Sequence, residues 1–214
     1  MRLQKVNLVM VHEQYQFENI QIPNPGLTRA MIPPEIYQHV MQEIREIVKD
    51  DRGIDKVNRN LAGVIEREYR LEKSKTHIVP FLEEMGREYQ KVWNVFPEKN
   101  LKVDSLWVNL QQKTEYNPMH KHTGILSYVA WLDIPYKMKE EMNLKNCKNS
   151  DSRESSASFQ FIYTTIIGNI INETYQVENG WEGRIVMFPA KLLHIVYPFY
   201  TSDGYRISIA GNLS

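Results

Sequence analysis

The sequence predicts a mainly β protein with helices, of the α+β class, with a β-sandwich or barrel in its C-terminal half. The chain changes character near residue 100: helical periodicity is clear before it, and short strands dominate after it. Many short strands without intervening helices are typical of a sandwich or barrel. The 214 residues correspond to a single domain. Residues 1–100 would be a helical and extended support region, and residues 101–214 the core.

The first hundred residues predict extended pieces followed by two amphipathic helices. Residues 3–22 predict two short extended pieces that end at the breaker Pro23-Asn24-Pro25-Gly26. Pro33-Pro34 opens a helix over residues 34–49, because proline suits the first helical turn, and residues 78–95 predict another. Both segments carry an apolar stripe at helical spacing, formed by Ile36, Tyr37, Val40, Met41, Ile44, Ile47 and Val48 and by Ile78, Phe81, Leu82, Met85, Tyr89, Val92 and Trp93. We expect both helices to pack on one sheet of the barrel; a partner-binding face is the alternative.

From Asp104 onward the chain consists of short segments rich in β-branched and aromatic residues, which predict strands. These segments are SLWVNLQ, GILSYVAWLDI, SFQFIYTTI, GRIVMF, HIVYPF and YRISIAGNL. Turn signals separate them at Asn117-Pro118, Asn179-Gly180 and Ser202-Asp203-Gly204. The polar stretch from Lys137 to Ala157 is either a solvated loop or a flexible lid.

The amino-acid composition limits the partners and the cellular location that we expect for the protein. Lysine plus arginine equals aspartate plus glutamate, 26 against 26, so there is no strong signal for nucleic acid or for an anionic membrane as partner. The single Cys147 cannot form an internal disulfide, which favours a reducing, cytoplasmic location. The N-terminal sequence lacks the pattern of a signal peptide, and no segment has the length to span a bilayer. We therefore expect an intracellular protein without a membrane segment.

Two of the six histidines are candidate metal ligands because of their spacing. His120 and His122 stand two apart in a segment expected to be extended, where alternate side chains point to the same face. Two imidazoles would then lie side by side, as a metal ion requires, although two histidines can also meet by chance. We interpret His12, His39 and His77 as surface or packing residues.

A third histidine and an arginine extend this candidate site. His194 begins another predicted strand, and alternation places Arg206 and Ser208 on one face of the last strand. Arginine offers a planar fork that grips a carboxylate through two hydrogen bonds, and a serine hydroxyl can add a third. A keto-acid fits this pattern, with one end on the metal and its far carboxylate on Arg206. The structural alternatives are a loop-capping histidine, an arginine paired with a surface carboxylate and a polar strand serine.

With these residues the chain resembles the iron(II)/2-oxoglutarate-dependent oxygenases. Members of that family fold as a double-stranded β-helix, which is a jelly-roll, cupin-like barrel. They bind iron through a His-x-Asp/Glu pair and a distal histidine, and bind the co-substrate through a later arginine. His120, His122, His194 and Arg206 match this pattern, and Ser208 completes an Arg-x-Ser phrase. The resemblance implies Fe(II) and 2-oxoglutarate as cofactors, with the three histidines as catalytic metal ligands.

The resemblance is closest to uncharacterised oxygenase-like proteins, many of them encoded by marine bacteriophages. These carry His-x-His, an upstream phrase like Trp107-Val108-Asn109 and a C-terminal phrase like Arg206-Ile207-Ser208-Ile209-Ala210-Gly211-Asn212. The likeness covers residues 105–214, whereas the upstream half shares only the phrase Asn60-Leu61-Ala62-Gly63. It implies that the core of residues 101–214 is catalytic, and that the protein acts in a host cytoplasm if a phage encodes it.

One position departs from the family pattern. His122 stands where the usual carboxylate ligand would be, so the site is more positive by one charge. A doubly charged keto-acid would neutralise a three-histidine iron(II) site, which favours its binding but puts conventional turnover in doubt. Asp133 and Glu115 are the nearest carboxylates in the sequence, and the spacing of neither makes it a replacement ligand.

Three further residues, Asn109, Tyr128 and Trp131, could line the same cavity. Asn109 shares strand parity with Trp107 and Gln111 and could hydrogen-bond the keto-acid near the metal; a ladder-edge amide is the alternative. Tyr128 and Trp131 could also face the cavity, although aromatic residues in a barrel more often belong to the core.

The leading functional hypothesis is an oxygenase that uses iron(II), 2-oxoglutarate and dioxygen to hydroxylate a substrate that the sequence does not identify. The first alternative is a three-histidine metal dioxygenase that needs no keto-acid, for which Arg206 has no obvious use. The second is a non-enzymatic jelly-roll structural or assembly protein, which failure to bind iron would indicate.

Overall fold

The computed structural model describes residue 18 and residues 24–49, 63–145 and 155–214. In these ranges the elements are β1 (Thr28–Met31), α1 (Pro34–Lys49), β2 (Glu68–Arg70), α2 (Lys75–Trp93), β3 (Val103–Gln111), β4 (Asn117–His120), β5 (Leu126–Asp133), α3 (Met138–Met142), β6 (Phe159–Thr164), β7 (Ile170–Tyr175), β8 (Arg184–Pro189), β9 (Leu193–Val196) and β10 (Arg206–Leu213). The predicted α+β class, mainly β with helices, is confirmed. The extended pieces expected over residues 3–22 lie outside the described residues except for Glu18.

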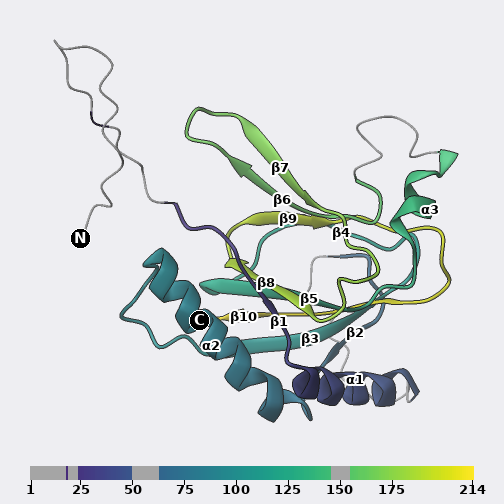
Figure 1. The fold of residues 1–214 in the computed structure, drawn as a ribbon, viewed down its shortest axis with the longest axis horizontal. Helices are drawn as coiled ribbons and strands as arrows, with labels where there is room; N and C mark the ends of the chain where they lie inside the picture. The colour runs from purple at the N-terminus through teal and green to yellow at the C-terminus, as the bar shows by residue number, and fades with distance from the viewer. Residues whose placement is uncertain (1–17, 19–23, 50–62, 146–154) are drawn as a thin grey trace.

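The described strands form two antiparallel sheets that face each other (Figure 1). The larger sheet has the order β1-β8-β5-β10-β3-β2, and the smaller has the order β4-β9-β6-β7. Strands of the C-terminal half therefore cross repeatedly between the two sheets, with β6 and β7 as a consecutive pair in the smaller one, as expected for a jelly-roll barrel. The short strands β1 and β2 come from the N-terminal region and form the two edges of the larger sheet.

Helices α1 and α2 cover the face of the larger sheet that points away from the smaller one (Figure 1). Alternation along β10 explains how one strand serves both sides: Ile207 and Ile209 join the core beneath the helices, whereas Arg206 and Ser208 line a cavity on the opposite face. The helices contribute buried side chains such as Val40 and Leu82 to that core. The prediction of N-terminal helices packed on one sheet is therefore confirmed.

A second apolar cluster lies on the other side of the larger sheet, against strands of the smaller one. It is largely aromatic, with Trp131 packed edge to face on Phe159, and Phe161 packed in the same way on Phe188. Offset and edge-to-face packing of this kind favours a fixed arrangement of rings. This cluster forms one wall of the cavity between the sheets.

Several elements differ from the sequence prediction. Strands β1, β2 and β7 are not predicted by the sequence because they are short or polar, and β4 includes Asn117-Pro118, which predicts a turn. Helix α2 begins at Lys75, earlier than the expected residue 78, because its start is fixed by contacts outside its own apolar stripe. None of the helices in the described part of the chain is long and apolar enough to cross a membrane.

The polar stretch of residues 137–157 is only partly described, since residues 146–154 lie outside the described ranges. Its beginning forms α3, which is anchored to the barrel by Glu141. The Glu141 carboxylate is fully buried and accepts hydrogen bonds from the backbone N–H groups of Tyr200 and Thr201 and from the Thr201 hydroxyl. A buried carboxylate with this number of donors fixes the segment around α3.

Candidate metal centre and co-substrate pocket

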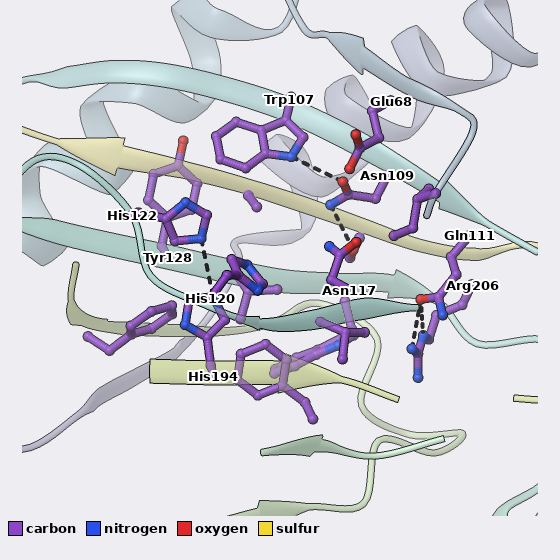
Figure 2. Close-up of a pocket in the computed structure, with 18 residues that line it drawn as sticks. Glu68, Trp107, Asn109, Gln111, Asn117, His120, His122, Tyr128, His194 and Arg206 are labelled. Carbon is purple, nitrogen blue, oxygen red and sulfur yellow. Dashed lines mark hydrogen bonds between the residues drawn. The ribbon is translucent and has the colours of Figure 1, made fainter. Parts of the chain in front are cut away.

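Three histidines from different parts of the chain converge at one end of the cavity between the sheets (Figure 2). His120 on β4 pairs in register with His194 on β9, and His122 lies two residues beyond the end of β4. Their ligand nitrogens all lie within 4.8 Å of one another, and Nε2 of His122 is 3.1 Å from Nε2 of His194. In the described part of the chain, this cluster contains no carboxylate, and neither Asp133 nor Glu115 joins it.

Backbone carbonyls orient two of the three imidazoles. Nδ1 of His120 lies 2.6 Å from the carbonyl oxygen of Pro118, and Nδ1 of His194 lies 2.9 Å from that of Leu192. Donation of Nδ1–H to these carbonyls leaves Nε2 as the lone-pair nitrogen in both rings. A second hydrogen bond of this type is the usual way in which a protein fixes the tautomer and direction of a metal-binding histidine.

The electrostatic environment keeps all three rings neutral. Burial, followed by the nearby His120, lowers the pKa of His122 to about 4 and that of His194 to about 3. Burial also lowers the pKa of His120, and its hydrogen bond with Pro118 opposes this only in part. Neutral imidazoles with free Nε2 lone pairs suit first-row divalent metals, including iron(II), so the residues present fit the metal that the resemblance implies.

Aromatic rings enclose this end of the cavity. Phe159 stacks on His194 with ring centroids 5.5 Å apart, and Phe188 meets the same imidazole edge-on at 5.1 Å. Trp107 lies near His122, with centroids 5.9 Å apart. An apolar wall of this kind limits access of water to the histidine cluster.

A row of residues across the larger sheet forms the floor of the same cavity. Glu68, Asn109, Ser208 and Trp131 stand opposite one another on β2, β3, β10 and β5, and all four line the cavity. Directly opposed residues on antiparallel strands point to the same face, which explains why they are brought together. The Asn109 amide accepts from Trp107 Nε1–H at 3.0 Å and donates to Ser208 Oγ at 3.2 Å.

Arg206 lies at the end of the cavity away from the histidines (Figure 2). It is buried, with 2% of its surface exposed, and its guanidinium group is enclosed by the rings of Tyr136 and Phe199. Its N–H groups donate to neutral acceptors: two to Gln111 Oε1, at 3.0 and 2.7 Å, and one each to the Tyr136 hydroxyl and the carbonyls of Ala157 and Tyr197.

The charge of Arg206 is not balanced by a carboxylate among the described residues. A buried cation that meets only dipoles favours an anion nearby, because a buried charge is stabilised best by an opposite charge. Gln111 Oε1 accepts from Nε and Nη2 together, which is the side-on position that a carboxylate oxygen takes on arginine. The alternative in which Arg206 pairs with a surface carboxylate is therefore not the arrangement observed among the described residues.

The structure brings the candidate residues from the sequence to one cavity: the three histidines, Asn109, Arg206 and Ser208 all line it. Tyr128 and Trp131 also line it while belonging to the core clusters. Sequence reasoning did not identify Glu68 and Asn117 as residues of this cavity. Glu68 lies on a strand of three residues, too short for any alternation pattern to indicate which way it faces.

Two facing antiparallel sheets with a histidine cluster between them define the double-stranded β-helix class of metal-dependent proteins. The family model described as "Putative 2OG-Fe(II) oxygenase" matches residues 105–212, so the chain belongs to the 2-oxoglutarate/iron(II)-dependent oxygenases. It is an oxidoreductase with iron(II) and 2-oxoglutarate as cofactors and dioxygen as co-substrate. No curated protein sequence matches the chain.

Solved structures share the fold at low sequence identity. A prolyl-4-hydroxylase from Pseudomonas putida is 11% identical with a TM-score of 0.53, over 87% of this chain and 90% of that one. A prolyl hydroxylase from Trichoplax adhaerens, in complex with a hypoxia inducible factor peptide, is 10% identical with a TM-score of 0.51, over 87% and 82%. HygX from Streptomyces hygroscopicus, with nickel and 2-oxoglutarate bound, is 10% identical with a TM-score of 0.51, over 87% and 81%. The predicted double-stranded β-helix is thereby confirmed.

Proposed function

We propose that this oxygenase is a hydroxylase whose iron is held by His120, His122 and His194, and whose 2-oxoglutarate is held by Arg206 with Ser208 and Asn109. The observation that carries the proposal is one cavity with three neutral imidazoles at one end and, at the other, a buried arginine that has no carboxylate partner among the described residues. A keto-acid with two carboxylates can span this cavity, with one of its ends on the metal and the other on the guanidinium group.

The bound iron and keto-acid supply the activation of dioxygen, and the protein supplies positions and electrostatics. The carbonyls of Pro118 and Leu192 hold two imidazoles in the ligand tautomer. The aromatic wall formed by Phe159 and Phe188 excludes water from that end. Asn109 ties Ser208 to the indole of Trp107, so that the hydroxyl is held beside the path between the two ends of the cavity.

Binding of the keto-acid requires one change at Arg206. The five hydrogen bonds of its guanidinium group go to protein acceptors, so an incoming carboxylate must replace at least one of them. Gln111 is the acceptor that we expect to leave, because its neutral amide oxygen occupies two donors of the cation. A charge-assisted bond is about twice as strong as a neutral one, which favours the exchange.

The first prediction tests this assignment by changing Arg206→Ala in the iron(II)-loaded protein. We expect 2-oxoglutarate affinity to fall about 10- to 150-fold, equivalent to a charge-assisted contact of about 1.5–3 kcal/mol, while iron affinity changes little. Titration of 2-oxoglutarate under anaerobic conditions, followed by succinate formation in air, measures both steps. The control is Arg184→Ala, which removes an exposed guanidinium that packs on Trp181.

Unchanged 2-oxoglutarate affinity in the Arg206 variant would show that the keto-acid binds elsewhere. Oxygen consumption by the wild-type protein without any keto-acid would favour the alternative of a three-histidine dioxygenase. That alternative has one observation in its favour, namely that the metal cluster contains no carboxylate among the described residues.

The cellular location, the origin and the kind of substrate of the enzyme are also proposals. The single Cys147 supports a reducing, cytoplasmic location. The likeness of the phrases around Trp107–Asn109 and Arg206–Asn212 to phage-encoded proteins supports a phage origin, and hence a host cytoplasm. The balanced charge supports a primary substrate other than long nucleic acid or a membrane.

A further inference from the structure

Glu68 is a carboxyl group on the floor of the cavity that the proposed reaction does not use. It belongs to β2, and its register partner is Asn109, so its side chain points to the cavity face of the larger sheet. Only 2% of its surface is exposed. Figure 2 shows its carboxyl group beside the side chains of Asn109 and Trp107, at the upper side of the cavity.

In the part of the chain that the structure describes, the Glu68 carboxyl group makes no hydrogen bond and no ion pair. The polar groups next to it are committed elsewhere: the Trp107 indole N–H donates to Asn109 Oδ1, and the Asn109 amide N–H donates to Ser208. None of these groups donates to the Glu68 carboxyl group, which is unusual for a group with such a high cost of burial.

The surrounding charges do not compensate for Glu68. The nearest carboxylate, Glu115, repels it and is itself fixed by the backbone N–H groups of Glu66 and Gln112. Burial, followed by this repulsion, raises the pKa of Glu68 to about 7. The neighbouring Arg67 donates to the Tyr205 hydroxyl rather than to Glu68.

A second acceptor in the same cavity also lacks a donor. Asn117, on β4, lines the cavity, and its Oδ1 is buried without a hydrogen-bond partner. Figure 2 shows its amide group between the histidine cluster and Arg206, on the side that faces Asn109. The cavity thus combines a cationic end at Arg206, which suits the keto-acid, with a buried carboxyl group at Glu68 that accepts no hydrogen bond from the described residues.

We propose that Glu68 binds a positively charged nitrogen group, an ammonium or a guanidinium, on the primary substrate. This inference rests on the proposed function and names the substrate class for the same site. A cation of this kind supplies both the opposite charge and the several N–H donors that the Glu68 carboxyl group lacks. A neutral substrate would leave the carboxyl group unpaired or would force it to remain protonated.

The test uses the full-length protein loaded with iron(II) and 2-oxoglutarate under anaerobic conditions. The probes are n-butylammonium and n-butylguanidinium, with n-butanol as the neutral analogue of similar length. The absorption band of iron-bound keto-acid reports binding of each probe, and succinate formation in air reports its effect on turnover. In the wild-type protein we expect saturable binding of at least one cation, and at least about 10-fold weaker binding of n-butanol.

Two variants assign the preference to Glu68. Glu68→Gln keeps the shape and removes the charge, so cation affinity should fall about 10-fold or more, whereas Glu68→Asp should retain the preference for cations over n-butanol. Glu66→Gln is the matched control, because Glu66 is an exposed carboxyl group two residues away on the same segment. The band of iron-bound keto-acid in each variant shows that the site is folded.

The outcomes separate the two levels of the argument. Absence of the keto-acid band in the wild-type protein would overturn the proposed function and this inference with it. If the band forms but no probe binds, or n-butanol binds as well as the cations, the substrate class is wrong and the proposed function stands. The same holds if Glu68→Gln binds the cations as tightly as the wild type.

Discussion

At the scale of single residues, three histidines that are each a weak indication of a metal site in the sequence lie together in the folded protein. His120 and His122 stand two apart, and His194 is far away in the sequence, yet the register of β4 with β9 places His120 opposite His194. The proposed ligand set is neutral because burial lowers the pKa of all three histidines. A neutral set leaves the metal more positive than a site with a carboxylate ligand, which favours a dianionic keto-acid as an additional ligand.

The second prediction is that His194→Ala abolishes specific metal binding. Loss of an outer hydrogen-bond partner already weakens a metal site about 10- to 100-fold, so loss of a ligand should weaken it by more than about 100-fold. Calorimetric titration with iron(II) under anaerobic conditions measures this, and His39→Ala is the control. His39 stacks on His77, so its loss should leave metal binding unchanged. Retention of wild-type affinity in the His194 variant would exclude this cluster as the metal site.

The third prediction concerns the stability of the metal-free protein and Glu68. Its pKa is raised to about 7 in the folded state from 4.5, so the folded state holds a proton that the unfolded state has released between these pH values. The wild type therefore loses stability relative to Glu68→Gln as pH rises from about 4.5 to 7, by up to about 3 kcal/mol, and the difference is constant above that range. Urea unfolding of both proteins at pH 4.5, 6 and 8 measures it.

A pH-independent difference between the two proteins would mean that Glu68 has a partner in solution. Glu66→Gln should follow the wild type at every pH, because its side chain is exposed.

Residue-scale prediction from sequence succeeds where a spacing rule connects residues on one strand and fails where contact depends on register between strands. Asn109, Ser208 and Arg206 were placed on the cavity face by alternation alone, and they line the cavity. Glu68 reaches the same cavity only because β2 pairs with β3, and no local pattern in Glu68–Arg70 indicates that pairing. The five hydrogen bonds of Arg206 likewise depend on the loop that contains Tyr197 and on Ala157.

At the scale of elements, the start of α2 is held by a side chain from α1. Ser74 precedes the helix but makes no side-chain cap of its own. Instead, the buried Glu43 carboxylate accepts hydrogen bonds from the backbone N–H groups of Glu72, Lys73 and Ser74 and from the Ser74 hydroxyl. A carboxylate at a helix N-terminus also interacts favourably with the helix dipole. This contact fixes the two helices relative to each other beneath the sheet.

The fourth prediction is that Glu43→Ala lowers the free energy of unfolding by about 1–3 kcal/mol, because it leaves buried N–H groups without an acceptor. Burial raises the Glu43 pKa, but the hydrogen bonds from Ser74, Lys73 and Glu72 outweigh it, so the pKa is lowered. A lowered folded pKa stabilises the protein above the unfolded value of 4.5, and this contribution is lost as pH falls through the folded value.

Chemical denaturation at pH 7 and at pH 3 checks both parts of this prediction. The gap between wild type and Glu43→Ala should be larger at pH 7 than at pH 3. Glu46→Gln, on the same helix, removes only an exposed ion pair with Lys73 and should leave the unfolding midpoint nearly unchanged. An equal gap at the two pH values would show that the carboxylate charge is not what stabilises the start of α2.

Element prediction was reliable for long periodic segments and poor for short ones. The stripes of α1 and α2 and the aromatic runs of β3, β5, β8 and β10 were identified because many residues repeat one pattern. The start of β4 was not predicted because Asn117-Pro118 is a turn signal, although the segment at His120 was expected to be extended. Strand β7 was not predicted because its side chains are largely polar or exposed. Both are edge strands of the smaller sheet, where the buried pattern is weakest.

At the scale of the whole molecule, the N-terminal region completes the larger sheet as well as covering it. The extended pieces expected over residues 3–22 lie outside the described residues except for Glu18, but β1 and β2 occupy the two edges of that sheet. Helices α1 and α2 bury Val40, Ile44 and Leu82 against the sheet face opposite the cavity. We therefore propose that residues 1–214 form a single folding unit and that residues 1–100 are not a separate domain.

The fifth prediction is that the fragment of residues 101–214 does not fold on its own. The fragment lacks β1 and β2, so both edges of the larger sheet would be exposed and could pair with other molecules. The fragment also lacks α1 and α2, so the side chains that these helices bury, such as Leu110, Ile185 and Ile209, would be exposed. We expect the fragment to be insoluble, whereas the full chain should unfold cooperatively in urea. A soluble fragment that unfolds cooperatively and binds iron(II) would instead show that the metal centre belongs to a barrel that folds without the first hundred residues.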